Sequence, residues 1–485
     1  MPTQFRVGAE APPTPGIVHL GLGQFHRAHA AIYTALAMQN QPGDWGIAGV
    51  TRRSRTVVDA MAAQDNLYSV LELAPNEHRV DIVDVHRGLF VAADQPDDVI
   101  ALLAADTTKL VTLTITEAGY HTGADGRLAV TDVEIAIDLA HPLQPASLLG
   151  LLAAGLWRRW QNGGAPISVL SCDNMLAAGH TTHDRVTQFL DAAGAPAAMI
   201  DWVRHDVAFP NAMVDRIVPS TTDATRDAVE GIIGVRDAVP VPAEKFTMWV
   251  LEDTFAAGRP AWQTAGAVFS DEVPKYELIK LRLLNGCYSL LSTMGVLAGL
   301  DSNPAAITTD YIAACVHAAQ DDEYLPTIQM PRDFDVHAHM NDLFDRWANT
   351  ALGDATYRVA TDGSMKLAQR IVVPANFALQ QGRMPQQMAL TAAAWICVTC
   401  PPPGFEPGPV ATKVFEPKAV AMAVATAGAS DARDHALRVM HGGFLPDDLT
   451  RWDDFNQRVA DFVQIIAADG VKAAALEALA SRQQQ

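Results

Sequence analysis

One apolar segment of the sequence carries four polar side chains of the kinds that move protons. A carboxylate, an ammonium group, an amide and a phenol occur there as Glu277, Lys280, Asn285 and Tyr288. In an α-helix each residue advances by about 100°, so these four side chains fall within an arc of about 140°. A neutral lysine can act as a general base, and an amide or a phenol can donate hydrogen bonds to a charged oxygen. This helix face could therefore catalyse proton transfer.

The same face has a second interpretation that involves no chemistry. Leu281 and Leu284 share it, so a partly polar seam between two domains explains the pattern equally well, while Arg282 points away from the arc. A free lysine is protonated at neutral pH, so a base at Lys280 needs apolar surroundings or nearby positive charge. The residues of this segment alone leave both interpretations open.

A glycine-rich turn near the N-terminus is typical of a dinucleotide-binding site. Gly21 and Gly23 follow a predicted strand at 17–20 and precede a predicted helix at 28–39. Glycines in this context let the backbone approach a pyrophosphate at a helix N-terminus. His26 replaces the third glycine of the usual pattern. The turn by itself is therefore a weak indication of a cofactor.

The residues after the second predicted strand concern the choice between NAD and NADP. An acidic residue at this position usually holds the ribose 2′-hydroxyl of NAD. Here the strand at 46–50 continues into Thr51-Arg-Arg-Ser-Arg55, which contains no acid. These arginines, Arg53 among them, could bind the 2′-phosphate of NADP or could form a solvated basic turn. NAD is the expected cofactor, and NADP remains open.

The predicted elements divide the chain into two parts. Up to about residue 270, strands alternate with helical segments, which indicates a parallel, doubly wound α/β sheet. These strands are predicted at 17–20, 46–50, 110–116, 167–170 and 248–252. Beyond residue 276, long Ala- and Leu-rich segments favour helices at 278–300, 305–320 and 387–397. We therefore predict an α/β domain over residues 1–270 and a mostly α-helical domain over residues 271–485.

Composition and charge narrow the range of partners. The 485 residues are 49% hydrophobic and carry a formal net charge of −20, so association with nucleic acid or an anionic membrane is not expected. No apolar signal core occurs at residues 1–16, and glycines and polar residues interrupt the most apolar stretch, 283–300. These features predict a cytoplasmic protein with reduced cysteines. Cys397 and Cys400 lack two further zinc ligands at sensible spacing, which favours buried thiols.

Several sequence blocks resemble the mannitol dehydrogenase family, the polyol-specific long-chain dehydrogenases and reductases. The first block is Gly21-Leu-Gly-Gln-Phe-His-Arg-Ala-His29. The others follow in the family's order, and blocks in register are more specific than any single motif. They are Gln64-Asp-Asn-Leu-Tyr68, Thr116-Glu-Ala-Gly-Tyr120, Ser171-Cys-Asp-Asn174, Phe209-Pro-Asn-Ala-Met-Val-Asp-Arg-Ile217, Glu252-Asp-Thr-Phe-Ala-Ala-Gly-Arg-Pro260, Lys280-Leu-Arg-Leu-Leu-Asn-Gly286 and Asp362-Gly-Ser-Met-Lys366.

This resemblance implies a fold, a reaction and a cofactor. It implies a Rossmann domain joined to a helical domain, in a monomer that uses NAD or NADP and no catalytic metal. The implied reaction transfers hydride between the cofactor and a secondary alcohol of a sugar polyol, as in mannitol and fructose. A hexuronate reductase of the fructuronate and mannonate type is the alternative. A non-catalytic relative that binds a sugar or a dinucleotide is a third possibility.

The resemblance also implies roles for individual residues. Lys280 matches the general base, Asn174 and Asn285 match the amides that donate to the alkoxide, and Glu277 matches a proton relay. Asn174 is placed well for this role by sequence alone, because it follows the end of a predicted strand. The substrate-binding matches are Asp215, Arg358 and Lys366, and the cofactor-binding matches are Gly21, Gly23, Phe25, Arg53, Thr116 and Glu117.

Three positions depart from the family pattern. Tyr288 stands where the family usually has histidine, Ala118 stands in place of lysine, and Ala178 in place of asparagine. A phenol at 288 can still donate to a substrate oxygen, but it fills more space than an imidazole. We therefore expect Tyr288 to belong to the catalytic group and to alter substrate preference.

Overall fold

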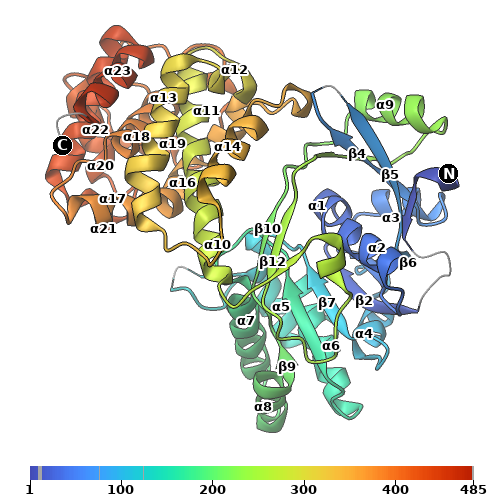
Figure 1. Cartoon of the computed structure of the whole chain (residues 1–485). Coiled ribbons are helices and arrows are strands. Elements are labelled where there is room, and N and C mark those ends of the chain that lie inside the picture. The colour runs from blue at the N-terminus through green and yellow to red at the C-terminus, as the bar shows by residue number, and fades with distance from the viewer. Residues whose placement is uncertain (9–13, 76, 124, 483–485) are drawn as a thin grey trace. The chain divides into compact units, whose positions relative to one another are not determined.

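The computed structural model describes residues 1–8, 14–75, 77–123 and 125–482. Its internal contacts divide the chain into two units, Met1–Pro274 and Lys275–Gln485. The first, which we call the α/β unit, contains all of the strands among the described residues, and the second, the helical unit, is built from helices and connecting loops (Figure 1).

A six-stranded sheet forms the centre of the α/β unit. Its strand order is β6-β3-β2-β7-β8-β9, and every neighbouring pair is parallel. This is the order of a doubly wound dinucleotide-binding sheet. From β2 the chain first adds β3 and β6 on one side and then adds β7, β8 and β9 on the other, so the strand order reverses between β2 and β7. The strands span His86–Val91 (β6), Gly46–Thr51 (β3), Pro15–Leu20 (β2), Leu110–Leu113 (β7), Ile167–Ser171 (β8) and Val207–Ala208 (β9).

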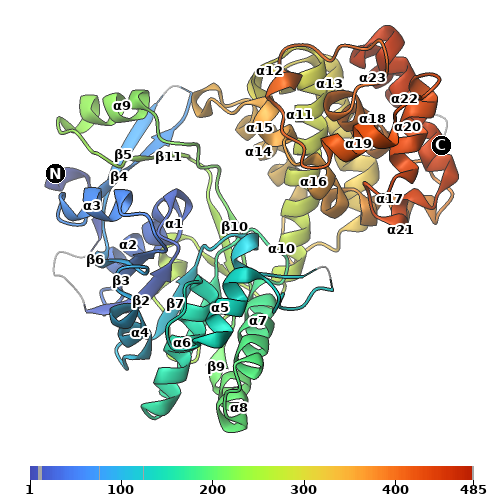
Figure 2. The same cartoon turned by 180° about the vertical axis from the view of Figure 1, so that it is seen from behind.

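Helices cover both faces of this sheet because its strands are apolar on both sides. Ile17 of β2 belongs to one buried core and its neighbour Val18 to another, as the two-residue period of a strand requires. The first core includes α1 (Gln24–Ala28), α2 (Ala30–Asn40) and α3 (Thr56–Ala62). The second includes α4 (Pro96–Ala104), α5 (Val133–Ala140), α6 (Leu148–Gln161), α7 (Ala178–Ala192) and α8 (Ala197–Asp206), seen from behind in Figure 2.

Two smaller sheets complete the α/β unit. One has the order β1-β5-β4-β11 and lies beside α9 (Asp223–Ile233); the other has the order β10-β12-β13. The strand predicted at 248–252 is β12, but it pairs antiparallel with β10 and does not join the six-stranded sheet. The strands span Arg6–Gly8 (β1), Tyr68–Leu73 (β4), His78–Asp84 (β5), Ala212–Asp215 (β10), Val241–Glu244 (β11), Met248–Leu251 (β12) and Val268–Phe269 (β13).

The helical unit is arranged around α18 (Gln386–Thr399). Every residue of α18 except Thr399 is buried, as expected for a helix that neighbours surround on all sides. No helix among the described residues is long and apolar enough to cross a membrane. The other helices are α10 (Val273–Ile279), α11 (Cys287–Leu297), α12 (Asn303–Ile307), α13 (Asp310–Ala318), α14 (Val336–Trp347), α15 (Thr356–Ala360), α16 (Gly363–Arg370), α17 (Val372–Leu379), α19 (Ala419–Ala425), α20 (Ala432–His441), α21 (Asp447–Thr450), α22 (Asp453–Asp469) and α23 (Val471–Arg482).

Two of the helices predicted in this unit are less regular than the sequence pattern suggested. The segment 278–300 is helical but contains a π-helix, Lys280–Gly286, between α10 and α11. The segment 305–320 is broken at Thr308 and Thr309, and α13 continues into a second π-helix, Ala319–Tyr324. Apolar periodicity identifies a helix but does not reveal such local changes in hydrogen bonding.

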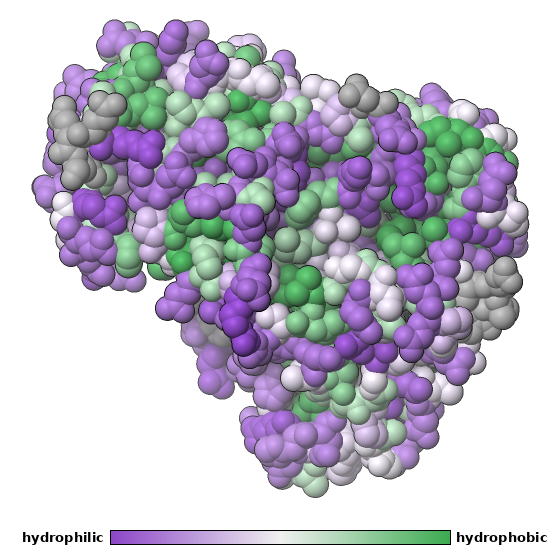
Figure 3. Space-filling view, in the orientation of Figure 1, coloured by the Kyte–Doolittle hydropathy of each residue, from purple (hydrophilic) through white to green (hydrophobic). Residues whose placement is uncertain are grey.

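The outer surface drawn in Figure 3 is mostly hydrophilic, as the net charge of −20 suggests. Hydrophilic residues cover most of the face drawn in Figure 3, and hydrophobic residues appear between them in smaller patches. All five cysteines are buried and unpaired, including Cys397 and Cys400 at the end of α18. The prediction of buried thiols at these two positions is therefore confirmed.

A cluster of buried histidines fills the space beneath the glycine turn. His26, which replaces the third glycine of the motif, turns inward and stacks on His19 with ring centroids 3.4 Å apart. Its Nε2 atom lies 3.2 Å from Nε2 of His86. His19 in turn contacts Thr114 Oγ1 at 3.0 Å, and Thr114 donates to the carbonyl of Gly21 at 2.7 Å. The imidazoles thus connect the turn to the interior of the unit.

These imidazoles should make the stability of the protein depend on pH. Burial lowers the pKa of His19 and of His86 to about 3, whereas a histidine in the unfolded chain has its ordinary value of 6.5. Between these values only the unfolded chain takes up the protons, so stability is complete above about pH 6.5 and falls as the pH drops toward 3. At pH 5 the loss should be about 2 kcal/mol for each such imidazole.

Urea unfolding of wild type and His86→Gln between pH 5 and 8 measures this effect. The slope of unfolding free energy against pH below 6.5 should be shallower in His86→Gln by about one proton. Gln41→Ala, a substitution at an exposed residue that does not titrate, is the control and should keep the wild-type slope. Equal slopes in wild type and His86→Gln would contradict the prediction.

Candidate active site

The glycine turn lies at the carboxyl end of β2, beside the point where the strand order reverses. Gly21 has a φ of +104°, and a Cβ atom there would lie 2.1 Å from the carbonyl oxygen of Thr114, so no other residue fits. The backbone N–H groups of Gly21 and Leu22 both donate to Val50 at the end of β3. Gly23 is exposed and begins α1; a Cβ atom there would meet only the Gly21 oxygen, at 3.6 Å. The open space above Gly23 fits a pyrophosphate that approaches the backbone closely.

The carboxyl ends of β7 and β8 are joined by the carboxylate of Asp173. It accepts hydrogen bonds from the N–H groups of Ile115 at 3.1 Å and Thr116 at 2.8 Å, and from the Tyr120 hydroxyl at 2.8 Å. Thr116 has a φ of +65°, which is strained for a β-branched residue, and Asp173 holds it there. Burial raises the pKa of Asp173 above its ordinary value.

Asp173 therefore positions candidate residues on both strands. Thr116 and Glu117 are exposed at the end of β7, and Asn174 is exposed immediately after Asp173. Asp173 belongs to the block Ser171–Asn174 that resembles the family, but the sequence pattern predicts no role for it. An acid beside Asn174 at a strand end was a signal that could have pointed to this role. Its backbone partners, however, lie 57 and 58 residues away in sequence, so the pattern around Asp173 does not reveal them.

Three other candidates of the α/β unit do not follow β7 or β8 in the chain. Phe25 is part of α1, and its ring stacks on that of His29 with centroids 5.0 Å apart. Asp215 is the last residue of β10, so it belongs to the three-stranded sheet and not to the six-stranded one. It is only 4% exposed. Arg53 is exposed in the loop after β3 and pairs with Glu134 at 3.2 Å.

In the helical unit, the π-helix contains both Lys280 and Asn285. A π-helix closes i→i+5 hydrogen bonds and is wider than an α-helix, and such segments are frequent at functional sites. The arc of about 140° expected for a regular α-helix therefore does not describe these side chains. Lys280 and Asn285 are partly exposed, and Glu277 on α10 is buried. Arg282 points inward and donates to the hydroxyl of Thr327 at 2.9 Å.

Two neighbours contact the π-helix at Asn285 and Gly286. Arg370 at the end of α16 donates to the carbonyl of Asn285 at 3.0 Å and to the Ser289 hydroxyl at 2.7 Å. Gly286 lies against the ring of Tyr324, because a Cβ atom there would come within 2.5 Å of Tyr324 Cζ. Tyr324 ends the second π-helix. The two π-helices thus pack together at the residue next to Asn285.

Tyr288 has a partner within the helical unit. Its hydroxyl donates to the carboxylate of Asp354, which also accepts a hydrogen bond from the Asn303 amide at 2.9 Å. The Tyr288 ring packs against Trp347, with centroids 5.8 Å apart. A substrate hydroxyl at Tyr288 would have to share this phenol with Asp354.

The two predicted substrate cations differ in their surroundings. Arg358 on α15 is exposed. Lys366 on α16 donates to the backbone carbonyls of Val359 at 3.1 Å and Thr361 at 2.6 Å, and burial together with Arg370 lowers the pKa of Lys366 to about 8. Arg358 is thus the more accessible of the two cations.

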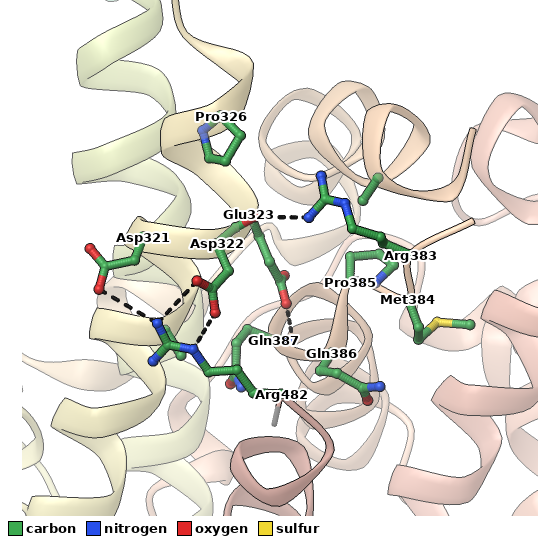
Figure 4. A pocket seen from close by; sticks show the side chains of 12 residues that line it. Asp321, Asp322, Glu323, Pro326, Arg383, Met384, Pro385, Gln386, Gln387 and Arg482 are labelled. Carbon is green, nitrogen blue, oxygen red and sulfur yellow. Dashed lines mark hydrogen bonds and ion pairs between the residues drawn. The ribbon is translucent and has the colours of Figure 1, made fainter. Parts of the chain in front are cut away.

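A cavity of about 340 Å³ in the helical unit lies beside the second π-helix (Figure 4). Arg482 pairs there with Asp321 and Asp322, and Glu323 accepts the backbone N–H groups that begin α18, at 2.7 and 2.9 Å. None of the predicted site residues lines it, and Glu323 serves as a cap for the central helix. Among the described residues, no three histidine, cysteine or acidic side chains are placed to hold a metal ion.

The Asp173 contacts predict a specific defect. Asp173→Asn replaces one accepting oxygen by an NH₂ group that faces an N–H or O–H donor, so the free energy of unfolding should fall by about 1.5–3 kcal/mol. The loop at Thr116 and Glu117 should loosen as well, and NADH binding should weaken. Urea unfolding and NADH fluorescence titration measure the two effects. Asp184→Asn, on the exposed side of α7, should change neither; wild-type values in Asp173→Asn would refute the role of Asp173.

The chain matches two family models over most of its length. The mannitol dehydrogenase Rossmann domain matches residues 15–264, and the mannitol dehydrogenase C-terminal domain matches residues 272–400. Mannitol 2-dehydrogenase of Cereibacter sphaeroides is 37% identical over 80% of this chain and 81% of its own length. D-mannonate oxidoreductase of Escherichia coli (strain K12) is 34% identical over 79% of each chain.

Solved structures agree with these matches. The ternary complex of Pseudomonas fluorescens mannitol 2-dehydrogenase with NAD and D-mannitol superposes with a TM-score of 0.86 and 31% identity, over 98% of this chain and 96% of that one. A D-sorbitol dehydrogenase in substrate-free form gives a TM-score of 0.85 and 28% identity over 98% of both chains. This chain, with its glycine turn, its strand order and its helical unit, therefore belongs to the mannitol dehydrogenase family.

Proposed function

We propose that this chain is an NAD-dependent oxidoreductase that interconverts a secondary alcohol of a sugar polyol, or of a sugar acid, with the corresponding ketone. The observation that carries the proposal is the likeness, over 98% of the chain, to a mannitol 2-dehydrogenase solved with NAD and D-mannitol. The α/β unit supplies the cofactor site in this proposal, and the helical unit supplies the base.

The cofactor fits the carboxyl edge of the six-stranded sheet. Gly21 and Gly23 leave room for the pyrophosphate, and Phe25, Thr116 and Glu117 border the same edge from α1 and from the end of β7. The nicotinamide ring, when bound, accepts or gives the hydride. Asp173 keeps the loop at Thr116 in place for it.

The protein residues manage the proton and the charge on the substrate oxygen. Lys280 takes the hydroxyl proton during oxidation and returns it during reduction. Asn174 and Asn285 donate hydrogen bonds to the oxygen while it carries negative charge. Glu277 passes the proton between Lys280 and solvent. Because Lys280 takes the proton and the two amides stabilise the charged oxygen, the reaction as proposed needs no metal ion.

A sugar acid is the second candidate substrate. The likeness to D-mannonate oxidoreductase favours it, and Arg358 is exposed and able to pair with a carboxylate. Asp215 and Lys366 complete the proposed substrate contacts. We also propose that the protein acts as a monomer in the cytoplasm, which is consistent with its five unpaired cysteines.

A substrate panel tests both the function and the base. NADH oxidation with ketoses and keto acids should reveal at least one active ketone, fructose or fructuronate being the first to try. Lys280→Ala should lower that rate by roughly 10²–10⁴-fold and leave NADH binding nearly unchanged, because the base acts only on the substrate. In wild type, oxidation should rise with pH and reduction should fall, since each needs a different protonation state of the base.

Lys275→Ala is the matched control for this test. Lys275 lies on α10, five residues before Lys280, and donates to the carbonyl of Met330 at 3.3 Å. It has no role in the proposed reaction, so its loss should leave the rate intact. If Lys280→Ala retained more than about a tenth of the rate, Lys280 would not be the base. If no ketone were reduced by wild type with either NADH or NADPH, the proposed function itself would be wrong.

Tyr288 lies at the start of α11, three residues after Asn285, and we expect it to influence substrate choice. Tyr288→Phe should lose about 0.5–1.5 kcal/mol of transition-state binding if the hydroxyl contacts substrate. Tyr288→His should raise kcat/KM on mannitol and fructose or on mannonate and fructuronate. Tyr311→Phe, a substitution at a partly buried tyrosine of α13, is the control. An unchanged substrate ranking in both Tyr288 variants would leave the tyrosine only its packing against Trp347 and its bond to Asp354.

A further inference from the structure

The loop between β3 and α3 contains three arginines, and each of them is paired with an acid from elsewhere in the chain. Arg52 and Arg53 both contact Glu134, and Arg55 pairs with Asp94 at 2.7 Å. The loop leaves the second strand of the dinucleotide-binding order, where the group that distinguishes NAD from NADP is read. The loop has no acid of its own.

Glu134 comes from the first turn of α5, 82 residues beyond Arg52. Its Oε1 atom accepts from Nη2 of Arg52 and lies 3.2 Å from Nη2 of Arg53, while its Oε2 atom lies 3.8 Å from His121. The hydrogen bond from Arg52 holds the pKa of Glu134 below its ordinary value, so the carboxylate is charged at neutral pH. Asp132 caps α5 and thereby fixes the position of this turn.

A ribose 2′-hydroxyl and a 2′-phosphate would interact differently with Glu134 and its two arginines. A ribose 2′-hydroxyl can donate to the Glu134 carboxylate and leave the arginine pairs intact. A 2′-phosphate carries negative charge and can only accept hydrogen bonds near neutral pH. It would have to displace Glu134 from the arginines or lie beside a like charge, and both cost binding free energy.

We propose that Glu134 is the specificity residue of the cofactor site: it occupies Arg52 and Arg53, accepts the 2′-hydroxyl of NAD, and excludes NADP. The inference rests on the proposed function, because it assumes that a dinucleotide binds at this edge of the sheet. It reverses the simplest interpretation of the sequence, in which the arginines favour a 2′-phosphate. The acid that the second strand lacks is supplied by a helix that is distant in sequence.

Glu134→Gln tests this inference, since glutamine keeps the size of the side chain and removes its charge. Isothermal titration of the full-length protein with adenosine 5′-monophosphate and adenosine 2′,5′-bisphosphate measures the effect without turnover. Wild type should prefer the monophosphate. In Glu134→Gln the ratio of the two affinities should shift toward the bisphosphate by at least about tenfold, as expected when arginine becomes available for a charge-assisted bond. The ratio of kcat/KM for NADPH and NADH should move in the same direction.

Two further variants show whether the effect belongs to Glu134. Asp94→Asn frees Arg55 in the same loop and should leave the affinity ratio within about twofold of wild type, because Glu134 still occupies Arg52 and Arg53. Adding Arg52→Gln to Glu134→Gln should abolish the gain. The Glu134 side chain is 30% exposed, so the variant should fold, and an unchanged thermal melting curve verifies this.

The outcomes separate this inference from the proposed function. If wild type binds NADH and reduces a ketone but accepts NADPH equally well, or if Glu134→Gln leaves the ratio unchanged, Glu134 has no role in selectivity and the function stands. An equal gain in Asp94→Asn would also overturn the role of Glu134. If neither adenosine ligand nor either dinucleotide binds to wild type, the proposed function fails first.

Discussion

The parallel pairing of β2 with β3 on one side and β7 on the other is the constraint on which the α/β unit depends. Parallel neighbours place all of their carboxyl ends at one edge, so segments distant in sequence must meet there. The glycine turn, the arginine loop and the Thr116 segment follow these three strands. All six residues of β3 and five of the six residues of β2 are buried, so the core beneath this edge fixes its position.

Hydrogen bonds to buried polar groups then give this edge its detailed form. Asp173 joins the ends of β7 and β8 and keeps Thr116 in a backbone conformation that a threonine rarely adopts. His19 and Thr114 connect the Gly21 carbonyl to the interior. Such groups are costly to bury without partners, and here most of their polar atoms have them. The conformations of the loops therefore depend on the packing of the whole unit.

In the helical unit, an otherwise apolar helical segment carries the polar side chains of Lys280 and Asn285. A regular α-helix through 278–300 would satisfy its own backbone. In the π-helix, Arg370 donates to the Asn285 carbonyl. Burial lowers the pKa of Arg370 to about 10, so it remains charged at neutral pH. Gly286 allows Tyr324 to approach at the same point. The position of Lys280 and Asn285 thus depends on α16 and on the second π-helix.

The sequence by itself determined the local features of this protein. The strand, glycine turn and helix near the N-terminus, the strands at 46–50 and 167–170 and the helix at 387–397 depend on periodicity and on glycine, which act over a few residues. The blocks that resemble the mannitol dehydrogenase family were readable for the same reason. Only the tertiary structure decided what each polar group contacts. Glu134 lies 82 residues from Arg52, Asp173 lies 57 from Thr116, and the π-helix needs Arg370. Such partners meet because the core folds the chain back on itself, and no local pattern records which residues that will bring together.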